Sequence, residues 1–272
     1  MRRSAVLVGT AAILLCSACS SGSAGSSGSS GDSSAAPAAA VRAAVAATEK
    51  STVRIDQRVD MSGEGQSFTV SVRGGMDLAG GKGRLTAGLD DPQGGGGGGA
   101  ATLDEVFTDG TVYFRMPKAT DGDTAWRSIP REKAEAHYLL RAPVNDPAHT
   151  LRQIAQMRSP VKAGEEKVNG TPTVHYRGRL DHQTLVLRMA AERRTKVDSM
   201  RDILNADLPV TADAWVDKAG HLVRSRLTFD VGGTKMVATL DFADFGKPVD
   251  TPAAPADAQA VPESDVGGPL TG

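Results

Sequence analysis

The stretch "VTADAWVDKAGHLVRSRLTFDVGGTKMVATLDFADFG", from Val210 to Gly246, decides the fold class of this 272-residue chain. Apolar and polar residues alternate along it, as they do in strands that bury one face and expose the other. Turn signals at Lys218–Gly220 and at Gly232-Gly233 divide the stretch into three runs. The pattern therefore predicts three consecutive antiparallel strands.

The same alternation continues toward the N-terminus. It recurs in "STVRIDQRVDM", Ser51 to Met61, and in "SFTVSV", Ser67 to Val72. The dipeptides Asp109-Gly110 and Asn169-Gly170 each separate two further strand-like runs, which is typical of tight β-hairpins. These runs predict one antiparallel sheet of many strands with a single apolar face.

Three helices are predicted beside these strands. The first covers Ala38 to Glu49, and the second opens at Asn145-Asp146-Pro147, where the aspartate suits the cap and the proline suits the first turn. A longer third helix covers His182 to Ala206, whose apolar residues fall near one stripe. The order of elements predicts an α+β fold in which one strongly bent antiparallel sheet carries helices on its concave face.

The N-terminus carries a targeting signal. Arg2 and Arg3 precede an uncharged apolar run that is too short to cross a bilayer. Ser17-Ala18-Cys19 then resembles the bacterial lipobox, although Cys16 stands where Leu or Val is usual. This resemblance implies a lipoprotein signal peptide over residues 1–18, lipidation of Cys19, and an anchor on the extracytoplasmic face of the cell membrane. The alternative is an ordinary secretory signal with an incidental cysteine.

Composition sets the other boundaries. Residues 19–37 are rich in Ser and Gly and predict a flexible tether, 38–248 form the domain, and 249–272 lack any period and predict a disordered tail. The glycine run in "DPQGGGGGG", Asp91 to Gly99, is interpreted as a loop, because no Lys-Ser/Thr pair follows it as in a phosphate-binding motif.

The charged and titratable residues argue against several function classes. The 31 Lys and Arg nearly balance the 32 Asp and Glu, so no nucleic-acid partner is expected. As a separate expectation, the protein is a monomer. We find neither a G-x-S-x-G elbow nor an H-E-x-x-H zinc motif. The sequence therefore predicts no enzyme, no catalytic residue, no metal and no cofactor. The histidines weighed for such roles are His137, His149, His175, His182 and His221.

Several blocks of the chain resemble one known family. They are "TDGTVYFRMP", "TAWRSIP", "GEEKVNGTPTVHYRGRLD", "ADAWVDKAGHLVRSRLTF" and "FADFGKPVDTPAAPADAQAV". Together they are similar to the LppX/LprG-type actinobacterial envelope lipoproteins, over roughly Ala38 to Val261. The resemblance implies the half-barrel of the LolA and LolB carriers, with an apolar cavity for acyl chains between sheet and helices. It carries no catalytic residue.

Small inward-facing residues are compatible with such a cavity. The function predicted is a membrane-anchored lipoprotein that binds, and on a further hypothesis carries, an acyl-chain lipid, a glycolipid or another hydrophobic ligand. The alternative is a non-catalytic envelope interaction or sensor module in which bulky residues fill the same space. The predicted cavity residues are Val53, Ile55, Val59, Val186, Met189, Ala212, Ala214, Ala238 and Leu240.

Overall fold

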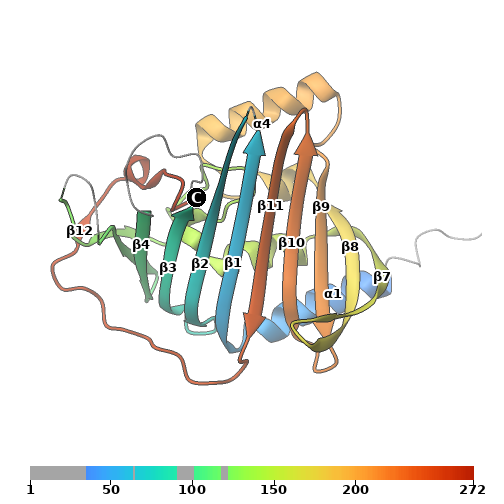
Figure 1. Ribbon diagram of the computed structural model, residues 1–272, viewed down its shortest axis with the longest axis horizontal. Coiled ribbons are helices and arrows are strands. Elements are labelled where there is room, and N and C mark those ends of the chain that lie inside the picture. The colour runs from blue at the N-terminus through green and yellow to red at the C-terminus, as the bar shows by residue number, and fades with distance from the viewer. Residues whose placement is uncertain (1–34, 64, 91–100, 118–121) are drawn as a thin grey trace, which may run out of the picture. The chain divides into compact units, whose positions relative to one another are not determined.

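A single twelve-stranded sheet dominates the computed structural model, which describes residues 35–63, 65–90, 101–117 and 122–272 (Figure 1). The strand order is β12-β6-β5-β4-β3-β2-β1-β11-β10-β9-β8-β7, so the described sheet has two edges and is not closed into a barrel. Every pairing is antiparallel except that of β12 with β6. The predicted α+β fold with one bent antiparallel sheet is confirmed. The strands are β1 (Thr52–Gly63), β2 (Gln66–Asp77), β3 (Lys82–Asp90), β4 (Ala101–Thr108), β5 (Thr111–Arg115), β6 (Arg127–Pro130), β7 (Arg158–Val168), β8 (Thr171–Leu180), β9 (Val210–Asp217), β10 (Leu222–Val231), β11 (Thr234–Ala243) and β12 (Gln259–Ala260).

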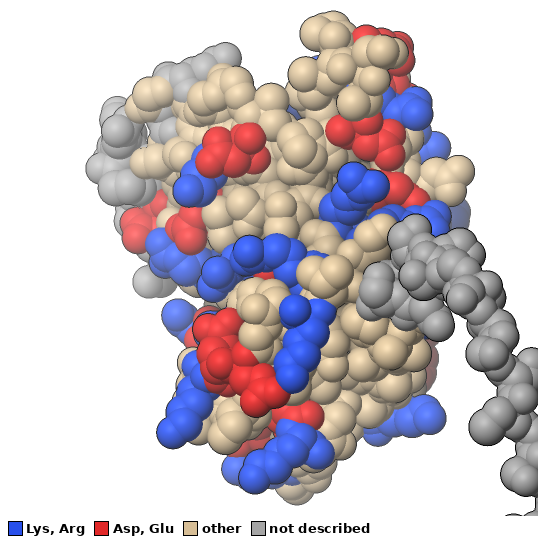
Figure 2. Space-filling view, turned by 90° about the vertical axis from the view of Figure 1, so that its right-hand side faces the viewer, with Lys and Arg blue, Asp and Glu red and all other residues tan. Residues whose placement is uncertain are grey.

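One edge of the sheet is β7, and its pairing with β8 is irregular. The register shifts between Arg158 and Val161 and again between Lys162 and Gly164, and Ser159 takes a left-handed conformation with φ 46°. Charged side chains follow these interruptions, including the ion pair between Lys162 and Glu165 at 2.5 Å. Figure 2, which looks at the β7 side, shows Lys and Arg interspersed with Asp and Glu. This face therefore carries no field of a single sign.

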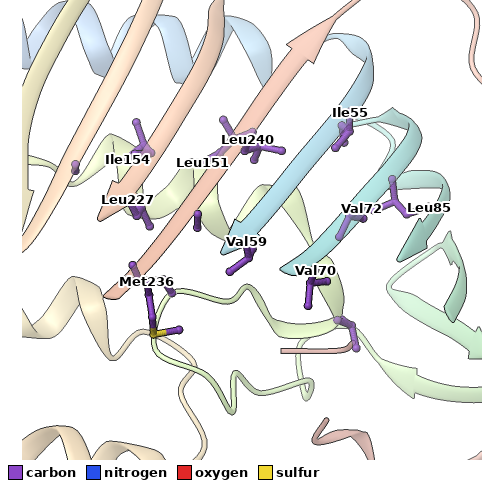
Figure 3. Close-up of a cluster of buried hydrophobic side chains, with 14 of the residues drawn as sticks. Ile55, Val59, Val70, Val72, Leu85, Leu151, Ile154, Leu227, Met236 and Leu240 are labelled. Carbon is purple, nitrogen blue, oxygen red and sulfur yellow. The ribbon is translucent and has the colours of Figure 1, made fainter. Parts of the chain in front are cut away.

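Two helices cover the concave face. α1 (Ala35–Thr48) buries Val41, Ala44 and Val45, and α2 (Pro147–Ala155) buries Leu151 and Ile154. Their apolar faces pack against the inward-facing residues of the central strands, where alternate side chains point to the same side. Figure 3 shows this core between α2 and the sheet; its labelled residues are Ile55, Val59, Val70, Val72, Leu85, Leu151, Ile154, Leu227, Met236 and Leu240.

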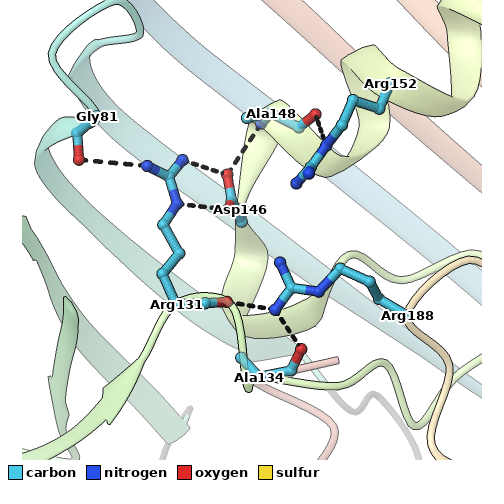
Figure 4. A network of polar contacts seen from close by, with 7 residues as sticks. All are labelled: Gly81, Arg131, Ala134, Asp146, Ala148, Arg152 and Arg188. Carbon is cyan, nitrogen blue, oxygen red and sulfur yellow. Dashed lines mark hydrogen bonds and ion pairs between the residues drawn. The ribbon is translucent and has the colours of Figure 1, made fainter. Parts of the chain in front are cut away.

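The start of α2 is fixed by a buried ion pair (Figure 4). Asp146 is the N-cap and accepts a hydrogen bond from the Ala148 backbone N–H, and Pro147 stands in the first turn. The Arg131 guanidinium donates to both carboxylate oxygens of Asp146, at 2.6 and 2.7 Å. Burial opposes ionisation of this carboxyl, but the hydrogen bonds and charge of Arg131 outweigh it and hold the pKa of Asp146 below its ordinary value.

The third predicted helix is broken in the structure. The region His182 to Ala206 forms a short α3 (His182–Leu185), an irregular segment, and then α4 (Ala191–Leu204). Arg188 has φ 53°, and its guanidinium donates to the backbone carbonyls of Arg131 and Ala134. Ala136 exchanges backbone hydrogen bonds with Arg188 and Ala190 at 2.9 Å. This pairing with a distant segment replaces the local helical hydrogen bonds.

The C-terminal residues also differ from the predicted disordered tail. β12 pairs in parallel with β6, a short 3₁₀-helix η2 (Glu263–Val266) follows, and Val266 and Leu270 are buried. The Leu270 carbonyl accepts hydrogen bonds from Arg141 and Asn145, both at 2.7 Å. Asn145 lies in a second 3₁₀-helix, η1 (Pro143–Asn145). Contacts with residues more than a hundred positions away order this segment. Because it forms no long regular element of its own, its sequence shows no periodicity.

Candidate functional site

An apolar groove of about 800 Å³ lies between α4 and one end of the sheet. Its floor comes from the β1–β2 and β10–β11 hairpin ends, and its walls come from α4 and the segment 137–139. Figure 1 shows α4 across the ends of these strands. The lining residues are Met61, Ser62, Gly63, Phe68, His137, Tyr138, Leu139, Met189, Arg193, Lys196, Val197, Met200, Leu204, Leu208, Phe229, Val231, Gly232, Thr234 and Met236.

The lining is adaptable as well as apolar. Met61, Met189, Met200 and Met236 contribute four of the eight methionines of the chain. Methionine has three rotatable bonds and a polarizable sulfur, so it packs against surfaces of variable shape. A groove of this composition can accommodate flexible hydrocarbon better than it can fix a rigid polar molecule.

α4 leaves much of its apolar face uncovered. Val197 is its buried residue, whereas Met200 is 37 % exposed, Leu204 45 % and Ile203 83 %. Met200 and Leu204 face the groove. Large apolar side chains gathered beside a groove typically mark a binding site for a ligand or partner.

Two cations also belong to the lining. Arg193 and Lys196 come from the first turns of α4, and the lining contains no Asp or Glu among the described residues. The Arg193 guanidinium lies 5.5 Å from the centre of the Tyr138 ring, and its Nε is buried without a hydrogen-bond acceptor. The groove therefore combines an apolar lining with two positively charged side chains near the N-terminal end of α4.

The predicted cavity residues lie mostly beside this groove and not in it. Met189 lines the groove, and Val186 is half-buried against the core. The others are buried in the hydrophobic core, and their side chains face inward as the alternation of apolar and polar residues predicted. They are Val53, Ile55, Val59, Ala212, Ala214, Ala238 and Leu240. The small alanines of β9 and β11 thus lie within packed core.

Some of the groove residues that the sequence analysis did not predict lie on the same inward-facing side of their strands as the predicted residues, nearer the strand ends. Met61 follows Val59 by two positions in β1, Phe229 follows Leu227 in β10, and Met236 precedes Ala238 in β11. Their large apolar side chains near predicted turns were the available signal. Leu139 and Tyr138 gave no such signal, because their segment has no regular period.

Cys19, the predicted lipidation site, lies outside the described residues, as does the glycine run at 91–99. Within the described ranges, no helix is long and apolar enough to cross a membrane.

The histidines occupy structural positions. His175 Nε2 lies 2.7 Å from an Asp213 oxygen, and its ring stacks on Trp215 with centroids 4.3 Å apart. Burial lowers the pKa of His149 to about 4. Within the part of the chain that the structure describes, no three His, Cys, Asp or Glu residues are placed to hold a metal ion. The other histidines lie beside acidic side chains: His137 by Glu192, His182 by Asp198 and His221 by Asp217.

Comparisons with known proteins give matches among solved structures. No protein-family model matches the chain, and no curated protein matches its sequence significantly. The Pseudomonas aeruginosa MucA/MucB complex matches with 13 % identity, 82 % of this chain and 59 % of that one covered, and a TM-score of 0.34. LprF from Mycobacterium bovis matches with 16 % identity, covering 81 % of this chain and 98 % of that one, at a TM-score of 0.45. The Mycobacterium tuberculosis lipoprotein LppX matches with 14 % identity, covering 80 % of this chain and 98 % of that one, at a TM-score of 0.42.

Proposed function

We propose that this chain is a lipid-anchored envelope protein that binds an acyl chain, from a lipid, a glycolipid or another hydrophobic ligand, in the groove under α4. The observation that carries the proposal is the groove itself, an apolar volume of about 800 Å³ beside a helix that exposes Met200, Ile203 and Leu204. Carriage of the bound lipid across the envelope is the further hypothesis. The proposal assigns no catalytic residue.

The size and lining of the groove suit such a ligand. Ligand sites in proteins usually measure about 300–1,000 Å³ and are lined mainly by hydrophobic side chains. Burying ten methylenes would contribute roughly 8 kcal/mol before the costs of ordering ligand and protein. Hydrophobic burial of a single acyl chain therefore supplies a driving force of the same order as the cost of association.

The anchor is proposed at Cys19 from the lipobox-like sequence that precedes it. Cys19→Ser is expected to release the protein from membranes and to abolish incorporation of radiolabelled fatty acid. Unchanged labelling of the Cys19→Ser protein would contradict the anchor and leave the groove proposal in place.

The second candidate is an interaction module, and the exposure of Ile203 favours it. Ile203 is 83 % exposed and does not line the groove, so an apolar segment of a partner protein could extend over α4. In that case the groove would receive protein side chains rather than lipid.

The deciding experiment is lipid extraction and mass spectrometry of the purified full chain carrying Cys19→Ser. Thr234→Trp places a large ring in the groove from an exposed position at the start of β11. Lys235→Trp is the matched control, because Lys235 is the next residue, is exposed, and does not line the groove. We expect co-purified lipid in the parent and in Lys235→Trp, and a loss of about fivefold or more in Thr234→Trp. Absence of lipid from the parent, together with failure of added acyl chains to bind, would favour the interaction module.

A further inference from the structure

We infer that the groove selects amphiphiles with an anionic head, held by Arg193 and Lys196, over neutral or zwitterionic ones with the same chain. This inference rests on the proposed function and names its ligand class. It starts from the placement of two cations in an otherwise apolar lining that contains no carboxylate among the described residues.

Neither of these two cations makes direct contact with a carboxylate of the described residues. Among the described residues, neither Arg193 nor Lys196 forms an ion pair. The acidic residues nearest to them on α4 face other partners: Glu192 lies 3.2 Å from His137, and Asp198 lies 2.9 Å from His182. Among the described residues, Glu192 therefore acts on Arg193 only through its charge, and no carboxylate makes a direct ion pair with either cation.

Several cations of the described sheet pair directly with an acid. Arg54, Arg73 and Arg158 each lie within 3.0 Å of a carboxylate oxygen. Figure 2 shows Lys and Arg interspersed with Asp and Glu on the β7 side, although other described cations such as Arg194 and Lys218 form no ion pair. What distinguishes Arg193 and Lys196 is their position in the lining of an apolar groove.

Arg193 has a specific unmet requirement. Its Nε is buried without an acceptor, and its guanidinium otherwise contacts the face of the Tyr138 ring. A buried donor without a partner costs free energy, and a guanidinium binds a phosphate or carboxylate oxygen with matching geometry. An oxyanion at this end of the groove would satisfy that donor once the side chain turns Nε toward it.

The order of residues along α4 matches an amphiphile. Positions three and four apart on a helix share one face, so Arg193, Lys196 and Val197 precede Met200 and Leu204 along one stripe. The stripe from residue 193 to 204 is about 16 Å long at 1.5 Å per residue. A head bound at the first turns would therefore let its chain run along the methionine-lined part of the groove.

The test uses two lysophospholipids with the same acyl chain, the anionic lysophosphatidylglycerol and the zwitterionic lysophosphatidylcholine. Each is titrated calorimetrically, below its micelle concentration, into the full chain carrying Cys19→Ser. We expect the parent to bind the anionic lipid about tenfold more tightly, as charge-assisted contacts at a partly desolvated site allow. Arg193→Gln with Lys196→Gln should remove this preference, because it lowers the affinity for the anionic lipid more than the affinity for the zwitterionic one.

The matched control is Arg194→Gln with Lys218→Gln, which changes the net charge equally at two positions outside the lining. This control variant should retain the tenfold preference. If the variant loses the preference, a general charge effect is responsible and the inference is overturned. Equal binding of both lipids by the parent would also overturn the inference and would leave the proposed function standing. Binding of neither lipid would contradict the proposed function itself.

A second measurement on the parent does not depend on the folding of any variant. Raising the salt concentration from about 0.05 to about 0.5 M should reduce the preference for the anionic lipid several-fold, because exposed charges are screened. A preference that does not respond to salt would contradict recognition by these two cations.

Discussion

Helices α2 and α4 are both amphipathic, but the protein holds them in opposite ways. α2 buries six of its nine residues, whereas α4 buries Val197 alone of its fourteen. α2 begins at a capping aspartate within an ion pair, while α4 begins at Ala190, which provides no side-chain cap. Helices owe most of their stability in proteins to packing of an apolar face. The difference teaches that α2 belongs to the core, whereas α4 borders a groove that the described side chains do not fill.

The ion pair at the start of α2 gives the largest expected difference. Asp146→Ala leaves Arg131 partly buried without its partner and should lower the free energy of unfolding by about 3–5 kcal/mol. The matched change on α4, Asp198→Ala, removes an exposed pairing with His182 and should cost less than about 1 kcal/mol. Urea unfolding of both variants measures this. Equal costs would break the distinction between the two helices.

One leucine from each helix tests the same contrast in apolar packing. Leu151→Ala in α2 should cost about 2–5 kcal/mol, because a fully buried side chain leaves a cavity. Leu204→Ala in α4 should cost under about 1 kcal/mol, because the leucine is already 45 % exposed. Thermal and denaturant unfolding report both values. A large loss at Leu204 would show that α4 is packed as part of the core.

Added volume should separate the packed centre from the groove. Ala214 in β9 is fully buried, so Ala214→Trp should destabilise the protein by at least about 1–3 kcal/mol through overpacking. Thr234→Trp at the groove should leave stability within about 0.5 kcal/mol of the parent. Melting temperatures of the two variants provide the comparison. If Ala214→Trp were neutral, space for a ligand would extend beneath the helices.

The burial of α2 also predicts a dependence of stability on pH. Burial lowers the pKa of His149 to about 4, and Arg152 and Arg188 add to this while Asp146 opposes it. Between the ordinary value of 6.5 and about 4 the unfolded chain binds a proton that the folded one excludes, so the free energy of unfolding should fall as the pH falls through this range.

His149→Gln should flatten this fall when unfolding is measured at pH 7 and pH 5. The change in the free energy of unfolding between the two pH values is compared between variant and parent. This is needed because burial raises the pKa of Glu105, which contributes with the opposite sign in both proteins. An identical pH profile in parent and variant would contradict the buried, neutral histidine.

Local patterns in the sequence predict most of the sheet. The alternation of Val53, Ile55 and Val59 identifies the buried face of β1, and glycine turns such as Asn169-Gly170 locate the hairpins. The N-cap role of Asp146 is predictable for the same reason, because capping depends on neighbouring residues. These features are encoded within a few positions of one another.

The groove could be predicted only in part, because it depends on contacts between distant segments. The break at Arg188 arises from hydrogen bonds to Arg131 and Ala134, more than fifty positions away, and it places α4 over the strand ends. The period of the sequence predicts one continuous helix there. The same limit applies to Leu270, whose carbonyl is held by Arg141 and Asn145. Filling of the space around Ala214 likewise depends on which residues α1 and α2 bring to it.

The irregular edge strand β7 has a consequence for molecules that meet at high concentration. A long regular edge offers unpaired backbone groups to a strand of another copy and so promotes aggregation. In β7 the two register shifts, Pro160 and the exposed Lys162 interrupt that row of groups, and at the other edge β12 spans two residues. Copies crowded side by side can therefore collide repeatedly without their sheets fusing into a continuous β-ladder.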